Sequence, residues 1–269
     1  MTSGAGPNPW DAPPATLPVA PPRFRPPPPF ASVHHLPFDG ARRETPTAMT
    51  FRFTLHGSDF RYLPNQFIAI VLSDVSDPWG PVRRFSLSSS PTESDAIAIT
   101  AKLTGTPYKQ RLATLQRGET VEVRGPIGHF VLEGKRAAVM IAGGVGISPF
   151  RGMIRYSADV GLQIPIRLLY SARVPEEFAF QRELDGIART HENVKIAYTV
   201  TRLNESRVPW DGRTGRIDAA MIRAASENLE DPMYYVCGTP AMVEGIATLL
   251  FDDLRISGES ILLERFLGY

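Results

Sequence analysis

From residue 135 to the end, the sequence alternates short apolar runs with longer segments of helical spacing. The apolar runs predict strands at 137–142, 166–172, 194–200, 233–238 and 260–266. The segments between them predict helices at 148–160, 175–188, 217–225 and 240–254. Because strands joined through helices run parallel and are covered on both faces, we expect this part to be a doubly wound parallel sheet.

The part between residues 30 and 134 has a different texture, with short alternating runs separated by Gly and Pro. Strands are expected at 49–57, 67–72, 83–90, 96–103 and 120–125, and one helix near 107–115. Such close spacing is typical of an antiparallel barrel or sandwich. The chain is therefore expected to hold two domains, 30–134 and 135–269.

Residues 1–29 differ from both domains, since they hold eleven of the 25 prolines of the chain. Proline lacks an amide donor and resists regular pairing, so this segment is expected to be an extended or disordered tail. A ligand for a proline-recognising domain is the alternative interpretation.

Composition narrows the classes of function. A net charge of +1 gives no electrostatic reason to expect nucleic acid as a partner. No apolar run reaches the roughly 20 residues that cross a bilayer, and the N-terminus lacks signal-peptide features, so a cytoplasmic protein with no membrane partner is expected. Cys237 is the only cysteine, and the five histidines lack metal-ligand spacing, which argues against a disulfide, a four-cysteine iron–sulfur cluster or another metal site.

Residues 140–154, MIAGGVGISPFRGMI, have the layout of a strand, a tight turn and a helix. Gly143, Gly144 and Gly146 permit close approach of a ligand, and the amides and dipole of the following helix attract a pyrophosphate. Pro149 suits the first helical turn. A tight packing turn without a ligand is the alternative.

The nature of the dinucleotide depends on the residues after the second and third strands of the sheet. Ser171, Arg173, Arg202 and Arg216 lie near their carboxyl ends, and arginine there favours the 2′-phosphate of NADP. The adjacent residues 176 and 177 are glutamates, which favour NAD, and each arginine can also be an ordinary solvated one. NADP is preferred, with NAD possible.

A second stretch, RRFSLSSS at 83–90, places an arginine, an aromatic ring and a hydroxyl at Arg83, Phe85 and Ser86. This combination suits an anion beside a flat heterocycle, because the three groups can bind phosphate, pack on a ring and bond its polar edge. A plain barrel strand with an exposed arginine is the alternative.

These two stretches occur with RGPIGHF, CGTPAM and a terminal aromatic in one order, and in that order the chain resembles the ferredoxin–NADP reductase superfamily over about residues 30–269. The resemblance implies a six-stranded flavin-binding barrel followed by a nicotinamide-binding domain. It also implies that Arg83 binds the FAD pyrophosphate, that Phe85, a tyrosine in the family pattern, flanks the isoalloxazine, and that Ser86 approaches flavin N5.

The resemblance assigns further cofactor-binding residues. In a second flavin-phosphate segment that begins at Lys102, Gly105 matches the family, whereas Lys109 stands where a hydroxyl is expected. In the nicotinamide turn, Gly144, Gly146 and Pro149 match, with Ser148 where threonine is common.

The second nicotinamide motif of the family falls on Cys237, Gly238 and Met242, which implies that Cys237 lies near nicotinamide C4. A buried small apolar residue is the alternative for this cysteine. Tyr269 would stack on the flavin and gate access to it, or else belong to a frayed terminus. Ser86, Cys237 and Tyr269 are therefore the candidate catalytic residues.

The resemblance implies a FAD-dependent NAD(P)H oxidoreductase that transfers a hydride to the flavin and then passes single electrons to a separate ferredoxin, flavodoxin or oxygenase component. The other possibilities are a flavin reductase that releases reduced flavin, and a non-catalytic flavin-binding subunit for redox sensing or assembly. Five arginines could help dock an acidic partner, but a solvated face is the preferred interpretation for them: Arg23, Arg25, Arg42, Arg43 and Arg84.

Overall fold

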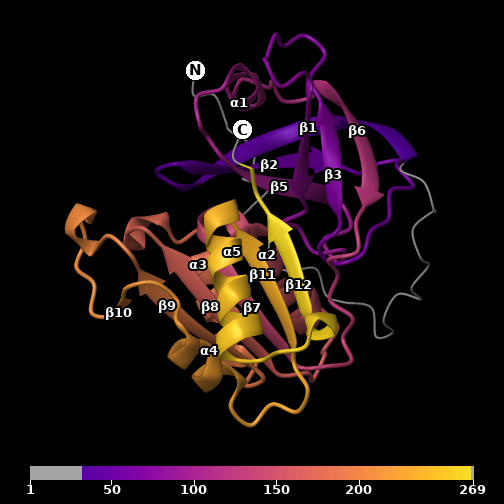
Figure 1. The fold of residues 1–269 in the computed structure, drawn as a ribbon. Helices are drawn as coiled ribbons and strands as arrows, with labels where there is room; N and C mark the ends of the chain where they lie inside the picture. Colours follow the sequence, from indigo (N-terminus) through magenta and orange to yellow (C-terminus); the bar gives the residue numbers. More distant parts are fainter. Residues whose placement is uncertain (1–31, 268–269) are drawn as a thin grey trace.

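A computed structural model describes residues 32–267 and shows two six-stranded sheets, one above the other in Figure 1. The first sheet is antiparallel, in the order β4-β3-β6-β1-β2-β5. Its strands are β1 (Ser32–Thr45), β2 (Ala48–Thr54), β3 (Phe67–Val71), β4 (Val82–Ser86), β5 (Ala96–Lys102) and β6 (Thr120–Ile127).

The antiparallel sheet closes on itself. Just beyond β4, Leu87 forms an antiparallel bridge with Ile99 of β5, and the amide of Ser88 donates to the carbonyl of Ala98 at 2.8 Å. These contacts join the two outer strands of the order, so the sheet is a barrel and not a sandwich. Helix α1 (Pro107–Ala113) lies between β5 and β6 in the chain, as predicted.

The sequence patterns missed strand β1, although it is the longest of the barrel. Its first part pairs with β6, from Ser32 to Pro37, and its second part pairs with β2, from Phe38 onward. Because the strand changes partner in the middle and contains Gly40 at φ +155°, its apolar alternation is broken into two short pieces. Neither piece stands out in a sequence.

The second sheet is parallel, in the order β10-β9-β8-β7-β11-β12, which confirms the doubly wound arrangement. The chain begins in the middle at β7, adds strands on one side, and then crosses to the other side at β11. In such sheets, ligands bind at the carboxyl ends where the order reverses. The strands are β7 (Ala138–Gly143), β8 (Ile166–Ala172), β9 (Val194–Val200), β10 (Arg213–Thr214), β11 (Met233–Gly238) and β12 (Ile261–Arg265).

Helices cover both faces of this sheet. One apolar core packs α2 (Ile147–Asp159) and α3 (Gln181–Thr190) against one face, and a second packs α4 (Ala219–Ser226) and α5 (Pro240–Thr248) against the other. The central strands β7 and β11 are buried on both sides, which explains their continuous apolar runs. The predicted helix 240–254 ends earlier as an α-helix and continues as one π-helical turn, Leu249–Asp253.

Within residues 32–267, no helix is long and apolar enough to span a bilayer. Over the same residues, no group of three or more His, Cys, Asp or Glu side chains is placed to hold a metal ion. The tail 1–29 and Tyr269 lie outside the described residues.

Candidate functional site

The glycine turn connects β7 to α2 through a short 3-10 segment, Gly144–Gly146. Gly144 has φ +54°, in the left-handed region, and a Cβ there would meet nothing within 4 Å, so its face is open. Gly146 is closed on the other side, since a Cβ there would overlap the backbone of Cys237. The turn therefore needs glycine at 146 for close packing, and it leaves open space at Gly144.

A cavity of about 570 Å³ lies in front of this turn, at the carboxyl ends of the parallel strands. That volume lies in the usual range for small-molecule and cofactor sites. Its walls include sequence-predicted residues from both domains: Lys102, Gly143, Gly144, Gly146, Ser171, Arg173, Arg216, Gly238 and Met242. The barrel contributes Thr45, Thr47 and Ala48 as well, so the cavity lies between the two sheets.

Two of the predicted residues support the turn from behind. Ser148 is fully buried and donates from its hydroxyl to the carbonyl of Val145 at 2.7 Å, while Pro149 is buried in the first turn of α2. Neither lines the cavity. Their place in the structure is a scaffold for the turn rather than a wall of the cavity.

The three predicted arginines differ in their surroundings. Glu205 forms ion pairs with Arg173 at 2.8 Å and with Arg202 at 3.0 Å, and their hydrogen bonds lower the pKa of its carboxyl. Arg202 does not line the cavity. Arg216 is exposed at the cavity wall, and within residues 32–267 it has no hydrogen bond or ion pair, so it is the arginine most available to an anion.

The two domains meet through a buried carboxylate. The Ser86 hydroxyl at the end of β4 donates to Oε1 of Glu264 on β12 at 2.8 Å, and the Cys237 thiol at the end of β11 lies 3.9 Å from Oε2. Burial raises the pKa of Glu264 above its usual value, although hydrogen bonds from Ser86 and Asn65 act in the opposite direction. Ser86 and Cys237, predicted from separate motifs, are thus joined by one side chain.

Cys237 is completely buried. Burial, and then the nearby Glu264 carboxyl, raise the pKa of its thiol well above the usual value. The group therefore remains a protonated thiol at neutral pH, suited to contact and weak hydrogen bonding rather than to nucleophilic attack.

Sequence reasoning missed Glu264 and Phe266. Both lie in the terminal run that drew attention for Tyr269, and a glutamate inside an otherwise apolar strand was the available signal. Phe266 lines the cavity, and its amide donates to the carbonyl of Gly238 at 2.8 Å. It is the aromatic residue that the described structure places at the junction of the domains.

On the barrel, Arg83 is buried beneath the loop that precedes β4. Its guanidinium forms a short ion pair with Asp77, donates to the carbonyls of Trp79 and Gly80 at 3.0 and 2.9 Å, and lies 4.9 Å from the ring centre of Tyr108. Asp77 also accepts from the Tyr108 amide at 3.0 Å. Arg83 therefore fixes the loop onto the start of α1, a contact that the sequence did not suggest.

Lys109 gives the clearest indication of an anionic ligand. Its side chain is buried, and its ammonium lies 4.7 Å from the ring centre of Phe85. Burial, with the charge of Arg83 adding to it, lowers the pKa of Lys109 to about 8. Among the residues described, none accepts a hydrogen bond from this ammonium or pairs with it, so a desolvated cation lacks its counter-ion. An unpaired buried cation of this kind is suited to an anionic ligand, and Gly105, at φ +78°, has no atom within 4 Å of where a Cβ would stand.

Comparisons with known proteins identify relatives of the chain. A family model described as an oxidoreductase NAD-binding domain matches residues 140–248. The chain is 29% identical over 238 residues to a flavohemoprotein of Bacillus subtilis, and the match covers 86% of the chain and 59% of the relative. It is 28% identical over 195 residues to a glycine betaine monooxygenase reductase subunit of Chromohalobacter salexigens, covering 71% of the chain and 52% of the relative.

Another relative matches over most of its own length. Ferredoxin–NADP reductase B of Sorangium cellulosum is 27% identical over 220 residues, which are 78% of the chain and 87% of the relative. The cytochrome b5 reductase domain of Ulva prolifera nitrate reductase superimposes with a TM-score of 0.74 at 22% identity, covering 87% of the chain and 97% of that domain. The chain thus spans between half and three-fifths of its first two relatives and shares the two-domain fold with the solved domain.

Proposed function

Because the chain belongs to the ferredoxin–NADP reductase superfamily, we propose that it is a FAD-dependent NAD(P)H oxidoreductase that delivers electrons to a separate acceptor. The observation that carries the proposal is the junction of Ser86, Glu264 and Cys237. Through it, the end of the barrel strand with the flavin motif meets the ends of two strands of the nicotinamide domain. A hydride donor and its acceptor need this proximity.

The barrel would hold the flavin chiefly through charge. Lys109 supplies an unneutralised cation for a phosphate, and Arg83 adds positive potential while it keeps the 77–82 loop in place. When bound, the flavin supplies the chemistry that the side chains lack, since it accepts two electrons as a hydride and releases them singly. The chain's task is therefore to position two nucleotides and to exclude water.

Glu264 is the group best placed to hold a proton at the junction. Its raised pKa favours the neutral acid, and the Ser86 hydroxyl and Cys237 thiol fix the two oxygens. The raised pKa shifts this carboxyl toward its protonated form, which carries no negative charge between the two domains. Removal of Ser86 would leave one carboxyl oxygen without its donor.

NADP is the preferred nicotinamide in this proposal. Arg216 is unpaired within the described residues and lies on the same cavity wall as Ser171, as a 2′-phosphate requires. Arg173 reaches the cavity too, but it shares its charge with Glu205. NAD remains the competing cofactor because Glu177 lines the same cavity.

The acceptor is proposed to be another molecule, namely a ferredoxin, a flavodoxin or an oxygenase component. Two relatives carry names of this type, a monooxygenase reductase subunit and a ferredoxin–NADP reductase. The sequence contains one cysteine, too few for an iron–sulfur cluster of the four-cysteine kind.

An anaerobic titration tests the proposal. The purified protein is titrated with NADPH and then, in a separate sample, with NADH, while the visible absorption of the flavin is followed. We expect rapid bleaching at stoichiometric NADPH and weaker bleaching by NADH. A flavin spectrum that neither cofactor bleaches would assign the chain to non-catalytic flavin binding, and loss of flavin on gel filtration after reduction would favour a flavin reductase.

A further inference from the structure

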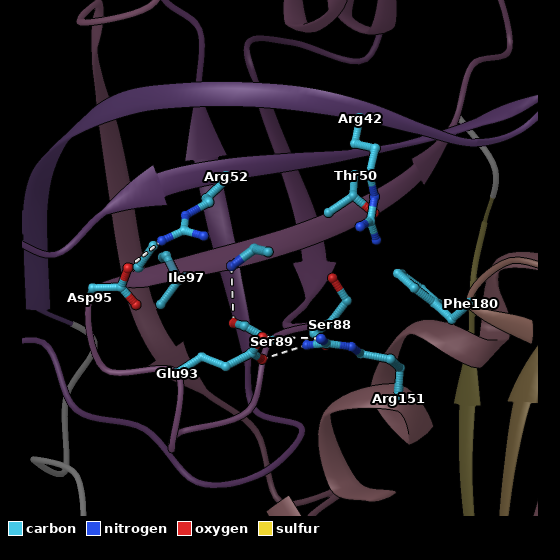
Figure 2. A pocket seen from close by; sticks show the side chains of 12 residues that line it. Arg42, Thr50, Arg52, Ser88, Ser89, Glu93, Asp95, Ile97, Arg151 and Phe180 are labelled. Atoms are coloured by element: carbon cyan, nitrogen blue, oxygen red, sulfur yellow. Dashed lines mark hydrogen bonds and ion pairs between the residues drawn. The ribbon is translucent and has the colours of Figure 1, made fainter. Parts of the chain in front are cut away.

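Helix α2 begins directly after the glycine turn, Gly144–Gly146, and one of its faces contacts the barrel. Arg151, one turn along the helix, extends from it toward the barrel segment that follows β4 (Figure 2). Its Nη1 donates to the carbonyl of Ser88 at 3.1 Å, and its two terminal nitrogens both bind the Glu93 carboxylate, one of them at 3.0 Å. These contacts cross from one domain to the other.

Arg151 is also bound within its own domain. Its Nε and Nη2 donate to the Glu183 carboxylate of α3 at 3.1 and 2.7 Å, and the Phe180 ring lies beside the guanidinium, 5.8 Å from it. The side chain is only 11% exposed. Burial works against its charge, but the two glutamates outweigh that effect and raise the pKa of Arg151, so the arginine remains charged at any pH at which the protein is folded.

Gly152 provides an independent sign of close contact at the same place. A Cβ on this residue would lie 2.7 Å from the carbonyl oxygen of Ser89, so the helix backbone rests almost directly on the barrel backbone. Farther along the helix, Asp159 accepts a short hydrogen bond from Thr92. The segment 88–93 therefore contacts α2 at Arg151, Gly152 and Asp159, over about two helical turns.

We propose that Arg151 is a positioning residue that, through Glu93 and Glu183, holds the nicotinamide turn in register with the barrel strand that carries the flavin motif. Ser88 lies two positions after Ser86 in the chain, and Arg151 lies five positions after Gly146, so movement at this contact is transmitted directly to both half-sites. This inference rests on the proposed function, because register matters only if the two nucleotides must react.

The test compares two variants that loosen the contact with two that do not. Arg151→Met removes the charge, and Gly152→Ala inserts a methyl group against Ser89 without changing charge. The matched controls are Arg213→Met, whose ion pair with Asp218 lies within the parallel-sheet domain, and Gly186→Ala, where a Cβ would meet only the end of Arg189 at 3.8 Å. Each protein is checked for flavin content and thermal unfolding.

The first readout is stopped-flow reduction of the bound flavin by NADPH under anaerobic conditions. In both test variants we expect the limiting rate at saturating NADPH to fall about tenfold or more, with the half-saturating concentration little changed, because reacting atoms that are misplaced by a fraction of an ångström react slowly. Long-wavelength charge-transfer absorbance should fall with the rate. Reduction by dithionite, which needs no alignment, should stay as in the wild type.

The second readout needs no nucleotide. Hydrogen exchange of the amides in 87–93 and 144–152 should accelerate together in Arg151→Met and stay unchanged in Arg213→Met. Wild-type rates and exchange in a folded Arg151→Met, or a wild-type limiting rate in a folded Gly152→Ala, would overturn the role of Arg151. If the wild-type protein itself is not reduced by either nicotinamide, the proposed function fails, and the exchange experiment still decides whether the contact couples the two segments.

Discussion

The barrel and the parallel sheet are prepared for their nucleotides by different physical means. On the barrel, the candidate flavin residues are buried charges, with Lys109 lacking a counter-ion among the described residues and Arg83 paired to Asp77. On the sheet, the candidate nicotinamide residues line an open cavity of about 570 Å³. Glycines form much of its inner surface, and the charged side chains of the sheet that line it include Arg173, Glu177 and Arg216. Flavin binding by the barrel is therefore expected to depend on charge, and nicotinamide binding by the parallel sheet on the volume of the cavity.

This difference matches the two roles that the proposal gives to the nucleotides. A buried cation is unfavourable without a counter-ion, so dissociation of its anion raises the free energy of the protein. Such a site favours a ligand that stays bound. A cavity bounded by backbone and small residues binds with less charge and releases more easily, as a substrate that turns over must be released. Changes of charge should therefore damage the barrel site, and changes of volume should damage the sheet site.

The largest effect is expected from Arg83→Met. The change removes positive potential at the flavin phosphates and leaves the buried Asp77 carboxylate without its cation, so the 77–82 loop loses its anchor. Flavin affinity should fall about 100-fold or more, since charge-assisted hydrogen bonds contribute about 1.5–3 kcal/mol each. The measurement is the flavin-to-protein ratio after gel filtration, together with fluorescence titration of the apoprotein.

The neighbouring Arg84 supplies the control. It is exposed on the same strand, with its guanidinium 5.8 Å from the Phe67 ring centre. Arg84→Met should retain flavin as the wild type does. Equal loss of flavin in both variants would mean that general positive charge, and not the buried site, binds the cofactor.

An added methyl group in the glycine turn should affect the nicotinamide site of the parallel sheet. In Gly146→Ala the added methyl group would overlap the Cys237 backbone, which cannot rotate away as a side chain can. Overpacking of this kind costs about 1–3 kcal/mol, so the KM for the nicotinamide should rise about 5- to 100-fold while flavin content stays normal. Steady-state kinetics with an artificial acceptor measure this, with Gly186→Ala as the control. Loss of flavin in Gly146→Ala would contradict the separation of the two halves.

The buried lysine predicts a pH dependence that the sheet site should lack. Because the pKa of Lys109 is lowered to about 8 in the free protein, the ammonium is mostly charged at pH 7 and mostly neutral at pH 9. Binding of a phosphate at pH 9 must then take up a proton, so flavin affinity should fall about tenfold from pH 7 to pH 9. Fluorescence titration of the apoprotein across this range gives the slope.

Two substitutions distinguish titration of Lys109 from a loss of flavin affinity that other groups cause at alkaline pH. Lys109→Met should bind flavin weakly at every pH, without the slope. Lys109→Arg keeps the charge throughout the range and should bind with little pH dependence. A slope that persists in both variants would show that another group titrates.

Local patterns predicted the elements that local chemistry determines. The run 137–142, the glycine turn and the helix 148–160 match β7 and α2 within a residue or two, because a buried parallel strand and a glycine turn each have a compact signature. Strand β1 and the two-residue β10 were missed, since one changes partner in the middle and the other pairs over only two residues. Their patterns are too short to be seen in a sequence.

In the candidate site, too, local motifs predicted some residues, whereas others depend on contacts between distant parts of the chain. Arg83, Ser86 and Cys237 are found from motifs, but Asp77 and Glu264 acquire meaning only from contacts, and Ser86 is 178 residues away from Glu264 in the chain. Arg202 lies three residues before Glu205, so its ion pair could have been anticipated from spacing alone. The pairing of Arg173 with that same glutamate could not, because it spans two loops.

The smallest effect is expected at the exposed wall of the cavity. Arg216→Ala should raise the KM for NADPH about three- to fivefold and leave that for NADH nearly unchanged, because an exposed cation meets the 2′-phosphate through solvent and is screened by salt. Arg202→Ala is the matched control, since Arg202 is equally exposed, lies outside the cavity and is paired with Glu205. The ratio of kcat/KM for the two cofactors, measured at low and at high salt, decides the matter. A ratio that is lower in Arg216→Ala than in the wild type at low salt, and nearly equal to it at high salt where the contact is screened, would assign charge selectivity to Arg216. An unchanged ratio at low salt would leave the selectivity to the shape of the cavity.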